Sequence, residues 1–184
     1  MMPTDQLVTE HVSIQLMLDV LERVCSKLDA GGKVPQKHLD QILEFVRVFA
    51  DQCHHGKEEE FLFPAMEKVG VPRDGGPIGV MLAEHTTGRQ YVKEFGEAIE
   101  RYGQSDPTAA KDLTRNARKY IELLTAHIEK ENGILFPMAE EHLPDRKKME
   151  LLTAFDRVDD EKIGKEKHEH LQGILKTLTK EYLS

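Results

Sequence analysis

Several features of common protein classes are missing from this 184-residue chain. There are two cysteines, Cys25 and Cys53, without C-x-x-C spacing or a disulfide framework, so we expect a reducing compartment. Basic residues number 25 against 33 acidic ones, and the resulting charge of −8 argues against nucleic acid or an anionic membrane as the main partner. No stretch approaches the ~20 apolar residues of a membrane span, and acidic residues interrupt the first twenty positions, which excludes a signal peptide. We therefore expect a single-domain, soluble, cytoplasmic protein.

Apolar side chains recur every three or four residues along most of the chain, a spacing that predicts amphipathic helices. The first predicted helix ends at Gly31–Gly32, and the second runs from Pro35 to about residue 68. A third follows the Gly/Pro-rich loop of residues 70–77, and a fourth begins after residues 103–107. The alternation typical of strands is absent. Four helices with short connections predict an all-α fold, an antiparallel up-down-up-down four-helix bundle over residues 1–143.

Residues 144–184 are predicted to form a C-terminal helical appendix that packs on the bundle within the same domain. Met149, Leu152 and Phe155 indicate a short helix, and an apolar stripe that includes His168 indicates a longer one. Pro64 and Pro137 lie inside helical patterns, so we expect each to end or kink its helix near the preceding residue.

An internal repeat divides the predicted bundle into two halves. The segment HHGKEEEFLFP at 54–64 aligns with HIEKENGILFP at 127–137, with an offset of 73 residues. TEH at 9–11 aligns with AEH at 83–85, with an offset of 74. Each half therefore contains a single histidine followed by H-x-x-x-E-x-x-x-L-F-P. A duplicated pair of helices predicts two halves related by approximate two-fold symmetry.

Histidine and glutamate four residues apart on a helix lie on one face, one turn from each other. Buried carboxylates must be paired or bound to metal, and imidazole with carboxylate suits iron, zinc or manganese. One lone histidine on an apolar stripe is more often a core residue with a satisfied hydrogen bond. The duplication nevertheless favours a dinuclear metal site at the bundle centre. The predicted ligands are His11, His54, Glu58, His85, His127 and Glu131.

This doubled motif resembles the hemerythrin-like (HHE cation-binding) domain family over about residues 4–140. The resemblance implies a bundle that holds two non-haem iron ions, with manganese or zinc as alternatives. It implies that His11, His54, His85 and His127 are terminal ligands. Glu58 and Glu131 would bridge the two ions together with an oxo or hydroxo group. Ferritin-like sites instead use Glu-x-x-His, which this sequence does not contain.

The sequence departs from the family pattern on the third predicted helix. Oxygen-carrying hemerythrins place a second histidine there, one turn after the first, where this chain has Arg89. One ion would then lack a ligand, and His168 is the residue we expect to supply it; the alternative is that His168 only packs the appendix on the bundle. His55 should point about 100° away from His54, at the surface or behind a ligand.

Two further residues have a core interpretation with a functional alternative. Cys53 is predicted to be a small buried hydrophobe, with a redox thiol as the alternative. Tyr120 is predicted to be a core residue, with a tyrosinate ligand as the alternative. Phe61, Phe63, Leu135 and Phe136 should form a dry wall around the metal site.

The predicted function is a di-iron protein that binds or responds to dioxygen, nitric oxide or peroxide, with output through a protein partner or the appendix. An under-ligated site would admit such ligands, which favours a binding protein over a dedicated enzyme. The alternatives are an enzyme acting on peroxide or in iron–sulfur cluster repair, or an iron-handling protein. Repair-linked family members typically have a cysteine-bearing N-terminal region, and this chain begins almost at the first ligand helix, which weighs against repair.

Overall fold

The computed structural model describes residues 1–184 and contains helices without strands, which confirms the all-α prediction. The symbol η denotes a π-helical segment. The elements are α1 (Pro3–Asp29), α2 (Gln36–Phe45), η1 (Val46–His55), η2 (Glu58–Leu62), α3 (Phe63–Lys68), α4 (Pro77–Gly103), α5 (Ala109–Lys130), η3 (Glu131–Leu135), α6 (Phe136–His142), α7 (Asp145–Arg157), η4 (Val158–Ile163) and α8 (Lys165–Leu183).

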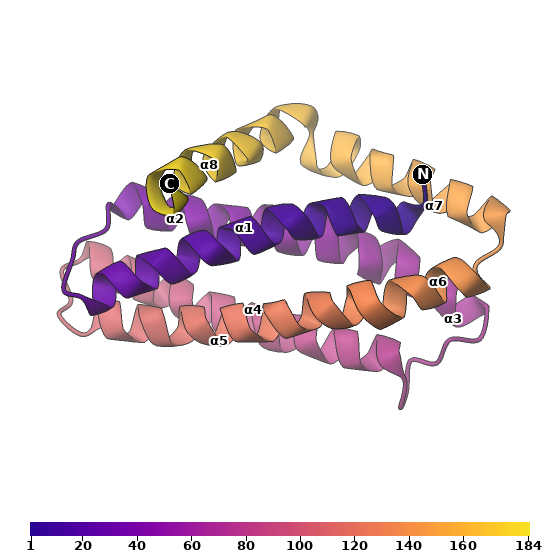
Figure 1. Cartoon of the computed structure of the whole chain (residues 1–184), viewed down its shortest axis with the longest axis horizontal. Helices are drawn as coiled ribbons and strands as arrows, with labels where there is room; N and C mark the ends of the chain where they lie inside the picture. The colour runs from indigo at the N-terminus through magenta and orange to yellow at the C-terminus, as the bar shows by residue number, and fades with distance from the viewer.

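Four long helical segments lie side by side in the molecule (Figure 1). They are α1, the continuous run from α2 to α3, α4, and the continuous run from α5 to α6. α5 packs against both α1 and α4, and α2 packs against α4. The up-down-up-down order of these segments stays a prediction, whereas their helical character is established.

The two prolines inside the helical patterns do not stop their helices. Each follows a π-helical segment, η2 before Pro64 and η3 before Pro137. The amide N–H of Phe63 bonds the carbonyl of Glu58, five residues back, and Phe136 bonds Glu131 in the same way. A proline lacks an amide N–H and its ring collides with the carbonyl four residues back, and a wider turn just before it relieves that crowding. The helix type therefore changes at each proline while the run continues.

Two apolar clusters flank a polar layer in the molecule. The larger cluster has 28 buried residues, among them Ile14, Phe45 and Phe95. The smaller has 14, and it contains Leu7 together with Phe63 and Phe136 of the predicted wall. Along each long segment the histidines and glutamates of the repeat fall between residues of these two clusters. The polar layer is consequently sealed by apolar side chains on both sides.

The C-terminal helices run across one side of the molecule, with α7 against α1 and α8 against α1 and α2 (Figure 1). The short helix predicted around Met149, Leu152 and Phe155 is confirmed as α7, in which Leu151 and Phe155 are buried while Met149 is 70% exposed. The division between residues 1–143 and 144–184 stays a prediction. No helix combines the length and the apolar character that a membrane crossing requires.

Candidate metal centre

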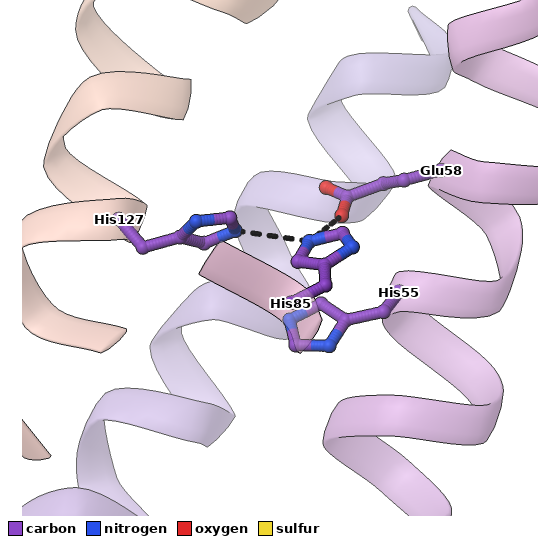
Figure 2. Close-up of side chains that lie close together, drawn as sticks. All are labelled: His55, Glu58, His85 and His127. Atoms are coloured by element: carbon purple, nitrogen blue, oxygen red, sulfur yellow. Dashed lines mark hydrogen bonds and ion pairs between the residues drawn. The ribbon is translucent and has the colours of Figure 1, made fainter. Parts of the chain in front are cut away.

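Seven buried histidine and glutamate side chains converge in the polar layer. They form two groups that share Glu58, and within each group the ligand atoms lie within 4.8 Å of one another. One group is His55, Glu58, His85 and His127 (Figure 2). The other is His11, His54, Glu58 and Glu131. All six residues of the predicted constellation are thus brought together, and His55 joins them.

The two glutamates connect the halves of the repeat. Glu58 has one carboxylate oxygen 3.4 Å from His54 Nε2 and the other 3.3 Å from His85 Nε2. Glu131 has its oxygens 3.0 Å from His127 Nε2 and 3.1 Å from His11 Nε2. Each carboxylate therefore contacts one histidine of its own half and one of the other half, as a shared ligand of two ions would.

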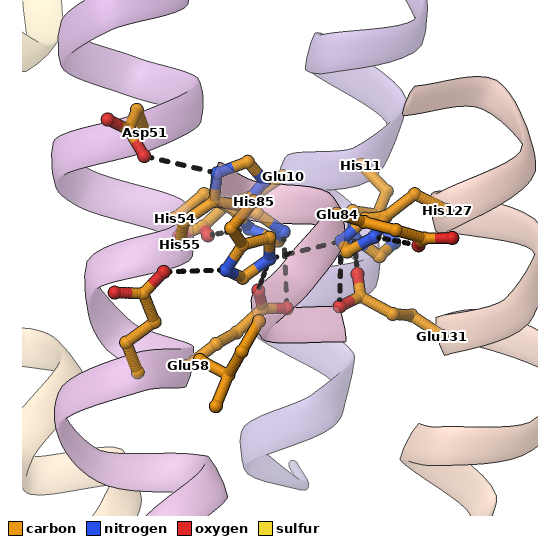
Figure 3. A network of polar contacts seen from close by, with 12 residues as sticks. Glu10, His11, Asp51, His54, His55, Glu58, Glu84, His85, His127 and Glu131 are labelled. Atoms are coloured by element: carbon orange, nitrogen blue, oxygen red, sulfur yellow. Dashed lines mark hydrogen bonds and ion pairs between the residues drawn. The ribbon is translucent and has the colours of Figure 1, made fainter. Parts of the chain in front are cut away.

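Every histidine of the centre also contacts a side-chain oxygen through its Nδ1 atom (Figure 3). The contacts are His11 to Asn132 at 2.7 Å, His54 to Glu10 at 2.7 Å, His55 to Asp51 at 3.3 Å, His85 to Glu59 at 2.7 Å and His127 to Glu84 at 2.8 Å. An acceptor at Nδ1 fixes that nitrogen as the N–H and leaves the other nitrogen of the ring free to bind a cation.

Glu10 and Glu84, which bond His54 and His127, were missed from the sequence, although the repeat contained the signal. Glu10 and Glu84 are the middle letters of TEH and AEH, and each bonds the histidine of the next helical segment in its own half. Lys57 and Lys130, which also align, bond these two glutamates. Glutamate before the first histidine of each half is therefore part of the site.

His55 differs from its prediction. Its side chain is buried, with 5% of the residue exposed, and its ring stacks on that of His85 at a centroid distance of 3.9 Å. An angle of about 100° from His54 holds only in an α-helix. Residues 46–55 form the π-helix η1 instead, whose wider turn brings successive side chains closer in direction. Both adjacent histidines are buried.

Four ligand atoms of the centre are buried without any hydrogen-bond partner. They are His54 Nε2, both carboxylate oxygens of Glu58, and Glu131 Oε1. Leaving such atoms unsatisfied in a dry interior costs on the order of 1–3 kcal/mol each, and more when they are charged. The donor set, five imidazoles and two carboxylates without a thiolate, suits iron, manganese or zinc. A cation among these atoms would satisfy all four, so the residues fit a bound metal.

The sequence-family model named the hemerythrin HHE cation-binding domain matches residues 2–139. The chain belongs to this family. The uncharacterized protein Rv1995 of Mycobacterium tuberculosis is 24% identical over 133 residues, which cover 72% of this chain and 51% of that protein. The iron-sulfur cluster repair protein YtfE of Yersinia pestis is 31% identical over 131 residues, covering 67% of this chain and 55% of YtfE. This chain thus spans about half the length of the curated relatives it matches. No solved structure matches it.

His168, predicted as a further ligand, lies in α8, outside the matched residues 2–139. Its Nε2 atom is 3.2 Å from Asp159 Oδ1 and 3.7 Å from Cys53 Sγ, and these three residues form a separate group. The structure does not bring His168 to either group of the centre. The fifth histidine that the structure brings to the centre is His55.

Charges within the HHE centre compensate one another. Burial acts to raise the pKa of Glu131, but the adjacent imidazoles of His11 and His127 outweigh it and hold that pKa below its usual value. Burial acts to lower the pKa of His85, yet the adjacent carboxylates of Glu58 and Glu59 raise it to about 9. In the metal-free protein a proton therefore resides on His85, and a cation that binds there must displace it.

A cavity of about 150 Å³ reaches the centre from one side. Its walls include His55 and His85 of the centre together with Gly88, Arg89 and Tyr120. Arg89 bonds Asp51 and Glu59, which in turn hold His55 and His85. Tyr120 is buried and lies outside both ligand groups, as its core interpretation predicts.

Proposed function

We propose that this hemerythrin domain is an up-down-up-down four-helix bundle that holds two non-haem iron ions. His11 and His54 would bind one ion, and His55, His85 and His127 would bind the other. Glu58 and Glu131 would serve both. The observation that carries the proposal is the convergence of four buried atoms of His54, Glu58 and Glu131 that lack hydrogen-bond partners.

We propose further that the centre binds or responds to a small molecule such as dioxygen, nitric oxide or peroxide. Bound iron would supply the redox chemistry. The cavity of about 150 Å³ that touches His55 and His85 is smaller than the roughly 300–1,000 Å³ of sites for drug-sized ligands. Its lining combines apolar side chains such as Val46, Val92 and Leu124 with charged ones such as Arg89 and Lys93, and its size favours a small ligand. The buried histidines and the two apolar clusters would exclude bulk water from the ions.

Iron–sulfur cluster repair is the second function we consider, because YtfE is among the relatives that this chain matches. The shared segment covers 55% of YtfE, so the comparison supports a common metal domain more strongly than a common activity. A repair protein must release or exchange its iron, whereas a sensor or carrier retains it. Iron retention therefore separates the two functions.

The first experiment counts metal in protein purified without oxygen. We expect about two iron ions per chain in the wild type and few or none in His54→Ala, since His54 Nε2 is one of the four buried atoms. His170→Ala is the matched control, because His170 is an exposed histidine that bonds Glu44 outside the centre. A wild-type content near zero, or a single zinc ion, would refute the di-iron proposal.

The second experiment exposes the reduced, iron-loaded protein to air, nitric oxide or peroxide and records its visible spectrum. A spectral change that reverses on removal of the gas supports a binding or sensing role. Consumption of peroxide over many turnovers supports an enzyme instead. Transfer of iron to an apo iron–sulfur protein, with matching loss from this chain, supports repair.

A further inference from the structure

The group formed by Cys53, Asp159 and His168 lies outside the centre described above, and we propose that it is a separate binding site for one divalent metal ion such as zinc. It shares no residue with the two groups of the HHE centre. Its three side chains offer a sulfur, an oxygen and a nitrogen atom, the donor types that zinc prefers in proteins.

The spacing of the three donor atoms fits a tetrahedral ion. Cys53 Sγ is 3.2 Å from Asp159 Oδ1 and 3.7 Å from His168 Nε2, and the oxygen and nitrogen are 3.2 Å apart. Metal bonds of about 2.3 Å to sulfur and about 2.0 Å to nitrogen and oxygen, at tetrahedral angles, place such atoms roughly 3.3–3.6 Å apart. An ion could therefore bind with shifts of a few tenths of an ångström.

The three ligands come from three different elements of the chain. Cys53 belongs to η1 and is fully buried, whereas Asp159 of η4 and His168 of α8 have side chains 23% and 22% exposed. An ion would be covered by the bundle on the thiol side and reachable from solvent on the other. Three protein ligands leave the fourth position to water, as in open zinc sites.

The surrounding charges balance when the ion is counted. Lys57 Nζ lies 2.7 Å from Asp159 Oδ1, and Lys57 also bonds Glu10. A free cysteine thiol has an ordinary pKa of about 8.5, so it carries its proton at neutral pH before a metal binds. Binding would form a sulfur–metal bond and release the thiol proton to solvent. The resulting thiolate and two carboxylates then carry three negative charges, against three positive charges on the lysine and the ion.

Without a metal, the same geometry is a hydrogen-bond hub in which Asp159 Oδ1 accepts from Cys53, His168 and Lys57. The two interpretations differ in one measurable respect, the formation of a metal–sulfur bond. If an ion binds, it also joins η4 and α8 to η1, one residue from His54. The site would then hold the C-terminal helices against the metal-binding segment.

The test is a titration of the purified, iron-loaded full chain with Co²⁺, followed by near-ultraviolet absorption. Thiolate coordination to cobalt gives an intense charge-transfer band, which nitrogen and oxygen ligands alone do not give. The HHE centre contains no cysteine, so cobalt bound there would leave this region silent. We expect one cobalt per chain to produce the band, and zinc to abolish it by competition.

Matched variants assign the band to residues. Cys53→Ser should abolish it, and His168→Ala should weaken cobalt binding at least 10-fold, of the order seen when a metal site loses a supporting group. Cys25→Ala and His170→Ala are the controls, because neither residue belongs to any ligand group, and both variants should keep the band. Helicity and iron content, measured on every variant, identify any that fail to fold.

A folded, iron-loaded wild type that shows no thiolate band with Co²⁺ would overturn the proposal without any variant. A band that persists in Cys53→Ser, or one that is lost in Cys25→Ala while the iron content is normal, would also overturn it. Iron content is measured separately from this band. A failure of the site at Cys53, Asp159 and His168 can therefore be distinguished from a failure of the di-iron proposal.

Discussion

The two halves of the repeat build the same arrangement from aligned residues and then differ in one histidine. In each half a glutamate on the first helix holds the histidine of the second, through His54–Glu10 and His127–Glu84. The first half adds His55, whose counterpart at an offset of 73 is Ile128. Duplication therefore accounts for the symmetric part of the centre, and a change in helix type accounts for the fifth histidine.

The lysines of the halves differ in environment as well. Lys57 has no exposed side-chain surface and contacts both Glu10 and Asp159. Its counterpart Lys130 is 39% exposed and contacts Glu84 alone. The difference arises because η4 and α8 cover only the first half, where η4 packs on η1. The C-terminal helices thus act on one half of a symmetric centre.

Removal of a shared carboxylate should have the largest effect. Glu58 belongs to both ligand groups, so we expect Glu58→Ala to lose both ions and to reduce metal content per chain from about two toward zero. Glu60→Ala is the matched control, since Glu60 lies on the same segment and pairs at the surface with Lys162. Metal analysis after gel filtration measures the outcome. Two ions retained in Glu58→Ala would show that this carboxylate is not shared.

Replacing His55 by the residue that the second half has at the aligned position should have the next largest effect on metal content. His55→Ile gives the first half the residue that the second half has at position 128. We expect about one of the two ions to be lost, because the group with His85 and His127 loses a ligand while the group with His11 and His54 keeps all of its own. Metal content and the visible spectrum measure this. An unchanged iron count would place His55 outside the set of ligands.

Replacement of Glu10 and of Glu84, which bond His54 and His127, should lower the free energy of unfolding by different amounts in the two halves. We expect Glu10→Gln and Glu84→Gln each to weaken metal binding by about 10–100-fold. The free energy of unfolding should fall by about 3 kcal/mol in Glu10→Gln, since Lys57 is left buried with one carboxylate fewer. In Glu84→Gln the fall should stay below about 1 kcal/mol, because Lys130 can reach solvent. Urea unfolding of the metal-free variants tests this order, and equal losses would contradict it.

A smaller effect is expected in the metal-free protein, whose free energy of unfolding should depend on pH through His85. The pKa of His85 is about 9 in the folded state and about 6.5 in an unfolded chain. A raised pKa contributes stability that is complete below about pH 6.5 and is lost as pH rises through about 9. We expect a loss on the order of 2 kcal/mol between these values. Urea unfolding at both pH values measures it. A profile identical to that of His85→Gln would contradict the prediction.

The sequence predicts much of this molecule because its signals are local or repeated. The apolar spacing of three and four residues indicates the helices, and the glycines at 31 and 32 mark the end of α1. The repeat identifies His54 and Glu58 together with His127 and Glu131, since alignment separates them from the charged residues around them. The structure brings all four of these side chains into one polar layer.

What could not be predicted depends on helix type and on contacts far apart in the chain. The direction expected for His55 assumed 3.6 residues per turn, whereas the place of His168 depends on how the α-helix α8 packs on the molecule. The π-helix η1 arises in the folded chain, and no simple residue pattern marks it. The pairing of Cys53 with Asp159 joins residues 106 positions apart, so it depends on where the appendix packs.

The π-helix η1 has a consequence for comparing other members of this family. Where two histidines are adjacent, an alignment made on α-helical spacing assigns one to the interior and the other to solvent. Here both lie inside, and the fifth imidazole of the centre comes from the second ligand segment, while the third carries Arg89. When a relative lacks a histidine where this chain has Arg89, the residue after the histidine of H-x-x-x-E is the place to look for a fifth imidazole.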